Sequence, residues 1–110
     1  MGSILLPDKG VNYMNIPEKI KIGYKDYEVK KVNDKLFDND TLCYGVIHYN
    51  VGLIEISSIY SEDTQKCALL HEILHGIDDI FDIGLHEEHI VKLAKGLYQV
   101  IKENPEVFGK

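Results

Sequence analysis

The spacing of apolar residues changes near Ser61, and this change constrains the fold more than any other feature of the sequence. Before it, apolar and polar residues alternate over residues 19–31 and again over 42–57, which is typical of half-buried β-strands. After it, apolar residues recur every three or four positions over 61–81 and 86–103, which predicts two amphipathic helices. Strands followed by helices in a chain of 110 residues predict a single α+β domain.

Turn residues divide each alternating region into a hairpin. Residues 23–26 and 50–52 supply the glycine, asparagine and aspartate that such turns favour. Residues 33–40, between the two hairpins, are mostly polar, so we predict a loop there. The predicted sheet is small, twisted, and antiparallel or mixed. We expect residues 1–17 to form a loosely ordered lead-in and residues 18–110 to form the domain.

The two predicted helices carry clear end signals. Ser61 is a suitable N-cap, and the acidic residues that follow it favour the positive end of a helix. Gly84 separates the first helix from the second. Asn104 and Pro105 end the second helix, because proline cannot continue the backbone hydrogen-bond ladder. These signals predict a helical hairpin after the strands.

The composition argues against several classes of partner. The net charge is -6 and all twelve basic residues are lysines, so the chain lacks the arginines that typically clamp phosphates and read guanine. Nucleic acid is therefore not an expected partner. Cys43 and Cys67 do not make a disulfide framework, and no apolar run approaches the roughly 18 residues of a membrane span. No signal peptide is apparent at the N-terminus, and we expect a cytoplasmic protein.

One motif in the first predicted helix carries chemistry. His71 and His75 are four positions apart, which places both imidazoles on one helix face at a spacing suited to a tetrahedral metal ion. Glu72, between them, fits the general base of an HExxH zinc hydrolase, which deprotonates a metal-activated water. The motif predicts one zinc ion per chain, held by His71 and His75, with Glu72 as the catalytic residue.

A catalytic zinc ion needs a third protein ligand, and the start of the second helix offers four. They are His86, Glu87, Glu88 and His89. Glu87 is favoured, because it lies one turn before the apolar Ile90 and would complete a His/His/Glu set. The other three stay open, since helix ends are predicted only to within about two residues.

Three further residues near the motif carry groups that could take part in its chemistry. Cys67 shares a helix face with the histidines, but eight residues of helix separate it from His75 by about 12 Å, which disfavours it as a ligand. His48 and Tyr49 lie on a strand close to the motif in sequence and carry groups that can donate to an oxyanion. A packed or solvated strand position is the favoured interpretation for both.

Two segments together resemble a known family. Residues 69–76, Leu-Leu-His-Glu-Ile-Leu-His-Gly, look like the active-site helix of ImmA/IrrE-type zinc metallopeptidases, especially the short forms that phages and prophages encode. Residues 87–105 are similar to the closing helix of that family, and the hairpin around Gly45 and residues 54–56 matches its strand pair. The resemblance spans roughly residues 20–105 and implies a minimal zincin-like fold with an active-site helix and a backing helix.

The resemblance implies a function as well as a fold. It suggests an endopeptidase that cleaves a protein substrate, such as a phage or host regulator, bound as an extended strand along a sheet edge. The third ligand in that family is a glutamate on the following helix, which supports Glu87 or Glu88. The alternative is a phage accessory module that binds metal and a partner protein without proteolysis. The sequence indicates no oligomeric state.

Overall fold

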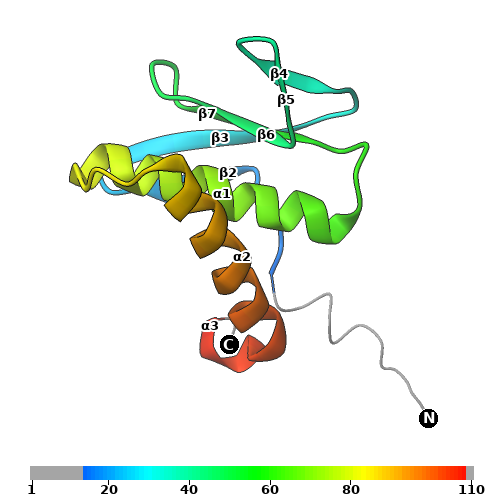
Figure 1. Cartoon of the computed structure of the whole chain (residues 1–110), viewed down its shortest axis with the longest axis vertical. Coiled ribbons are helices and arrows are strands. Elements are labelled where there is room, and N and C mark those ends of the chain that lie inside the picture. The colour runs from blue at the N-terminus through cyan, green and yellow to red at the C-terminus, as the bar shows by residue number, and fades with distance from the viewer. Residues whose placement is uncertain (1–13, 109–110) are drawn as a thin grey trace.

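In the computed structural model, which describes residues 14–108, strands precede helices as the sequence predicts (Figure 1). Residues 1–13 of the predicted lead-in lie outside the described residues. The α+β class is confirmed. The elements are β2 Lys19–Ile22, β3 Lys25–Val32, β4 Leu36–Asp38, β5 Thr41–Cys43, β6 Gly45–His48, β7 Leu53–Ser57, α1 Glu62–Phe81, α2 Glu87–Glu103 and α3 Pro105–Phe108.

Both predicted hairpins are present and they join into one mixed sheet. The first strand of the second hairpin is shorter than the alternation over residues 42–49 predicts, because residues 42 and 43 belong to β5 and Tyr49 lies in the turn. The strand order is β2-β3-β7-β6. Strands β2 and β3 pair antiparallel, as do β6 and β7, whereas β3 and β7 pair parallel in the centre. This order leaves β6 as an edge strand, so one side of its backbone is free of sheet pairing within the described part of the chain.

The main core lies between the sheet and α1, which crosses one face of the sheet (Figure 1). Its buried members come from the end of β2, from alternate positions of β3 and β7, and from one face of α1. They are Ile22, Tyr27, Val29, Ile54, Ile56, Ala68 and Leu69. The second helix packs on α1 through a smaller cluster that includes Leu70, Ala94 and Ile101. The position of α2 therefore depends on its contacts with α1.

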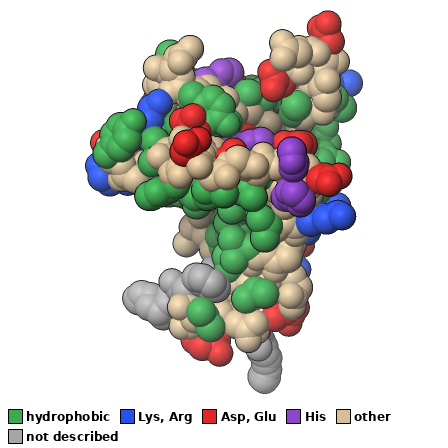
Figure 2. Space-filling model, turned by 60° about the vertical axis from the view of Figure 1, so that its left-hand side comes forward, with side chains coloured by type: hydrophobic (Ala, Val, Ile, Leu, Met, Phe, Trp, Pro, Cys, Tyr) green, Lys and Arg blue, Asp and Glu red, His purple; other side chains and the backbone are tan. Residues whose placement is uncertain are grey.

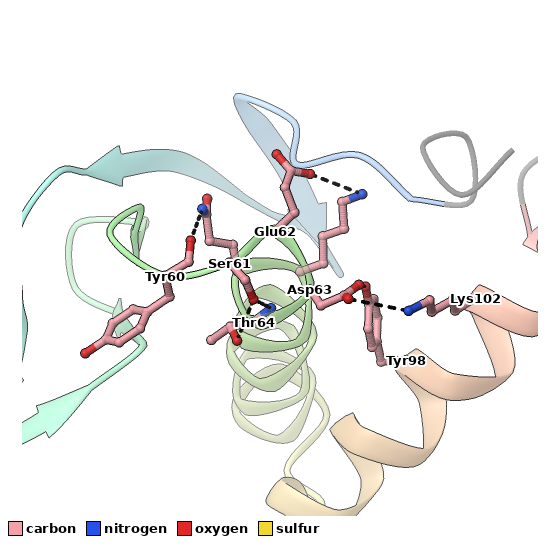
Figure 3. A network of polar contacts seen from close by, with 9 residues as sticks. Tyr60, Ser61, Glu62, Asp63, Thr64, Tyr98 and Lys102 are labelled. Atoms are coloured by element: carbon pink, nitrogen blue, oxygen red, sulfur yellow. Dashed lines mark hydrogen bonds and ion pairs between the residues drawn. The ribbon is translucent and has the colours of Figure 1, made fainter. Parts of the chain in front are cut away.

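Polar contacts at the start of α1 hold the far part of α2 (Figure 3). Ser61 is the N-cap, and its side-chain oxygen accepts a hydrogen bond from the backbone N–H of Thr64 at 3.2 Å. Asp63 accepts a hydrogen bond from the Tyr98 hydroxyl and a longer one, 3.4 Å, from the ammonium group of Lys102. The first turn of α1 thus lies beside the last turns of α2, so the two helices run in opposite directions.

The side chain of Asp78, near the end of α1, closes the other end of the helical hairpin. The Asp78 side chain accepts hydrogen bonds from the backbone N–H groups of Gly84 and Leu85, at 2.7 and 2.9 Å. These two residues lie in the connection between α1 and α2, after the left-handed Asp82 that ends α1. The bonds order the connection and thereby place the first turn of α2 beside α1.

The prediction of a loop over residues 33–40 is wrong. Strand β4 lies within it and pairs antiparallel with β5 in a separate two-stranded sheet. Asn39 and Asp40 both have positive φ angles, which is the two-residue turn that asparagine and aspartate favour in hairpins. The strands escaped prediction because each has only three residues, and most of their side chains are exposed or half-buried.

The C-terminal end differs from prediction by one short helix. As expected, α2 ends before Asn104. The four-residue helix α3 then begins at Pro105, because the fixed φ of proline suits the first position of a new helix.

In the described part of the chain, no helix has the length and apolar character needed to cross a membrane.

Replacing Gly52 by alanine is expected to lower the free energy of unfolding by about 2 kcal/mol. Gly52 has a φ of +68°, and a Cβ there would lie 2.8 Å from the backbone oxygen of Asp26. The matched control is Gly96→Ala in α2, where a Cβ meets no atom within 4 Å. That control should raise stability by about 0.5–1 kcal/mol, through helix propensity. Urea denaturation measures both, and equal stability of the two variants would contradict the expectation.

Candidate metal centre

The first helix presents two imidazoles to the first residue of the second helix. The rings of His71 and His75 lie on one face of α1 with their centroids 4.9 Å apart, and both side chains are mostly buried. The Glu87 carboxylate reaches both of them: Oε2 lies 3.0 Å from His71 Nε2, and Oε1 lies 2.9 Å from His75 Nε2. The structure therefore brings together the three residues that the sequence favoured as ligands.

The geometry of these three residues fits a metal ion. One ligand atom from each lies within 4.8 Å of the other two, and no other such group occurs within residues 14–108. Around a tetrahedral zinc ion with bonds near 2.1 Å, ligand atoms stand about 3.4 Å apart. The carboxylate oxygens are slightly closer than that to the imidazole nitrogens, so a small side-chain rotation would admit the ion. Two imidazoles and a carboxylate also suit other divalent cations.

The other candidate ligands lie apart from this group. His86 is the N-cap of α2, and its ring faces that of His89 with 5.3 Å between centroids. Glu88 is exposed. Cys67 lines the same cleft as the histidines but does not belong to the ligand group. Of the four residues at the start of α2, only Glu87 meets the motif histidines in that group.

Burial shifts the pKa values of two groups at the site, lowering that of the His71 imidazole and raising that of the Glu72 carboxyl group. Burial lowers the pKa of His71, with Glu87 acting in the opposite direction, and a neutral imidazole is the form that binds metal. Burial, assisted by the charges of Glu87 and Asp38, raises the pKa of Glu72 to about 8. A nearby cation would favour the ionised form of Glu72. This carboxyl group is therefore placed to exchange protons at neutral pH.

The edge strand passes close to Glu72 because position 45 is glycine. A Cβ at Gly45 would lie 3.3 Å from Cγ of Glu72 and 3.1 Å from the backbone oxygen of Glu55. These contacts are tight, so a side chain at position 45 would require the Glu72 side chain and the neighbouring strand to shift by a few tenths of an ångström. The buried glutamate therefore lies directly against the edge strand β6.

The group faces a cleft of about 860 Å³. Its walls come from the β4–β5 hairpin, the edge strand β6 and one face each of α1 and α2. Figure 2 shows histidine and acidic side chains gathered on one face of the molecule, bordered by apolar side chains. Asp38, from the β4–β5 hairpin, also lines this cleft, so that three acidic residues, Asp38, Glu72 and Glu87, lie around it. Asp38 was not predicted as a site residue, because residues 33–40 were expected to form a loop. The consecutive Asn39 and Asp40, which favour a two-residue hairpin turn, are the sequence feature that could have indicated the β4–β5 hairpin.

The structure separates the two residues that were expected on one strand: His48 ends β6, and Tyr49 lies in the turn that follows. Tyr49 lines the cleft, and burial, followed by the charge of Asp79, raises the pKa of its phenol to about 12, so it remains an O–H donor at neutral pH. His48 is not among the lining residues, and its Nε2 lies 2.9 Å from Glu55 on the neighbouring strand. Tyr49 is thus available to the cleft, whereas His48 contacts Glu55 at the protein surface.

Comparison of the chain with protein-family models, with curated proteins and with solved structures finds no match. The chemistry open to this protein is therefore inferred from its own residues. Two imidazoles and a carboxylate can bind a divalent cation, and a second, buried carboxyl group lies beside them in an open cleft. This combination is suited to hydrolysis assisted by a metal ion.

Proposed function

We propose that this protein is a zinc-dependent endopeptidase that hydrolyses peptide bonds of a protein substrate. The observation that carries the proposal is the meeting of His71, His75 and Glu87, with Glu72 buried beside them in one cleft. The resemblance to ImmA/IrrE-type metallopeptidases suggests a phage or host regulator as the substrate. A module that only binds metal would not need a buried, proton-accepting carboxyl group at this position.

Each residue has a role in this proposal. A bound zinc ion would supply Lewis acidity and lower the pKa of a coordinated water to about 7. Glu72 orients the attacking water, accepts its proton and delivers that proton to the leaving nitrogen. His71, His75 and Glu87 would hold the cation through two imidazole nitrogens and a carboxylate oxygen. Placing Glu72 against the edge strand excludes bulk water from one side of the carboxyl group.

The free edge of β6 supports an extended peptide as the substrate. Strand β6 pairs with β7 on one side only, and its residues Gly45, Val46 and Ile47 line the cleft. A peptide can add to such an edge through backbone hydrogen bonds. The α1 face of the cleft runs from Thr64 to His75, which is about 16 Å of helix, or the length of roughly five extended residues.

Zinc content tests the metal centre directly. Purified protein equilibrated with zinc is expected to hold about one ion per chain, because three ligands converge on one point. His71→Ala should lose most of it, whereas His48→Ala, which removes a histidine outside the cleft, should keep it. Elemental mass spectrometry after removal of unbound metal gives the stoichiometry. Equal zinc in the wild type and in His71→Ala would contradict the proposed site.

Cleavage tests the reaction. The zinc-loaded protein is incubated with a proteome-derived peptide library, and mass spectrometry identifies new termini. We expect internal cleavage that a chelator abolishes and added zinc restores. Zinc binding at the site without any cleavage would instead favour the alternative, a module that binds metal and a partner protein.

A further inference from the structure

The cleft extends beyond the candidate metal centre along both helices. Glu87, Val91 and Lys95 line it from α2, and Cys67 and Thr64 line it from α1. Since the two helices run in opposite directions, the N-terminal half of α1 and the middle of α2 border the same end of the cleft. This end, lined by Thr64, Cys67, Val91 and Lys95, is called the distal subsite.

Lys95 gives the distal subsite a charge that the rest of the cleft lacks. It is the only lysine that lines the cleft within the described residues, and its side chain is exposed. No ion pair is recorded for it among residues 14–108, in contrast to Lys66, which pairs with Glu62, and Lys102, which pairs with Asp63. Burial raises the pKa of Cys67, and Lys95 opposes this effect, so the charge of Lys95 acts inside the cleft.

The charges of the cleft are divided between its two ends. Asp38, Glu72 and Glu87 cluster around the candidate metal centre, and Lys95 lies at the distal subsite. An acidic side chain on a bound peptide would be attracted by the ammonium group of Lys95 at the distal subsite. The protein as a whole carries a net charge of -6, so Lys95 is a local exception rather than part of a basic surface.

The spacing along α2 sets where such a side chain would lie on a peptide. Glu87 and Lys95 are eight residues apart on one helix, or about 12 Å. An extended peptide advances about 3.3 Å per residue, so this distance spans three or four residues. Val91 lies between these positions on α2 and offers an apolar wall to the intervening side chains.

We infer that Lys95 is a specificity-determining residue that selects peptides with an acidic side chain three or four residues from the cleaved bond. This inference rests on the proposed peptidase function, and it names the substrate class of that site. The recognition is an ion pair at the rim of the cleft, so it selects among peptides without taking part in the chemistry. Exposed ion pairs of this kind change binding by about two- to fivefold.

Peptide binding to a non-cleaving variant provides the test. The probes are acetylated, amidated nine-residue peptides of alanine and glutamine, with a single glutamate moved from position to position, and a matching lysine series. Binding to zinc-loaded Glu72→Gln is followed by nuclear magnetic resonance titration. We expect about two- to fivefold tighter binding when glutamate occupies one favoured position. Adding Lys95→Glu should reverse the preference toward lysine at that same position.

Lys92→Glu is the matched control, because Lys92 is an exposed lysine of α2 that does not line the cleft. It should leave the glutamate preference unchanged. Peptides that bind without any preference, or a preference that survives Lys95→Glu, would overturn the role of Lys95 alone. A preference in binding, together with no cleavage by the wild type, would contradict the peptidase proposal and keep the subsite. Absence of any peptide binding would overturn both.

Discussion

Glu72→Gln is expected to abolish peptide hydrolysis, while the protein keeps its fold and its zinc. The amide has nearly the same shape as the carboxyl group but cannot accept the proton of the attacking water. Loss of a general base lowers rates by about 10²- to 10⁴-fold. The side chain is only 6% exposed, and a neutral amide places no charge in this buried position, so the substitution should not destabilise the metal-free protein. Cleavage of the peptide library and zinc content are measured on the same preparations.

Two comparisons make the Glu72→Gln result specific. Glu103→Gln changes an exposed glutamate of α2 outside the cleft, and should leave both cleavage and zinc content unchanged. Glu72→Asp keeps a carboxylate but draws it back from the cleft, so it should retain part of the activity lost in Glu72→Gln. Full cleavage by Glu72→Gln would contradict the assigned role. The alternative is a module that binds zinc and a partner protein without cleaving that partner. In that case Glu72→Gln should leave both zinc binding and partner binding unchanged.

The local elements of this fold could be predicted because each carries its own signal. The helix over residues 62–81 has a serine cap, acids in its first turn and a continuous apolar face. The two hairpins have alternating residues on both sides of their turns. How the hairpins join could not be predicted, because the parallel pairing of β3 with β7 depends on packing against α1 and leaves no mark in either strand. The β4–β5 hairpin was missed because it buries little apolar surface.

In the candidate site, too, the residues of one helix could be predicted, whereas the residue that a second helix contributes could not be fixed. His71, Glu72 and His75 share one region of α1 as a consequence of helix geometry, so the motif alone indicates them. Glu87 could only be favoured among four neighbours, because its place beside the histidines depends on the angle at which α2 leaves α1. That angle follows from tertiary contacts, including the hydrogen bonds from the α1–α2 connection to Asp78. The sequence shows an aspartate at position 78 but not what it binds.

Glu87→Ala is expected to weaken zinc binding by more than about a hundredfold. Losing a hydrogen-bond partner of a ligand typically costs ten- to a hundredfold in metal affinity, and a direct ligand should cost more. The Glu87 carboxylate also lies within 3.0 Å of both imidazole nitrogens, so its loss removes the group that holds the two rings toward one point. Competition with a chromogenic chelator measures the affinity.

The neighbouring residues decide whether this loss identifies the third ligand. Glu88→Ala removes an equal charge one position away on an exposed side chain, so a general loss of negative charge would weaken zinc binding in both variants. His89→Ala tests the remaining imidazole of this helix turn. We expect both to bind zinc as the wild type does, because neither side chain belongs to the group that meets His71 and His75. A loss confined to Glu88→Ala or His89→Ala would mean that α2 rotates when metal binds. In that case the contact between Glu87 and the two histidines would be a feature of the metal-free protein, and the third ligand would be the residue whose loss weakens binding.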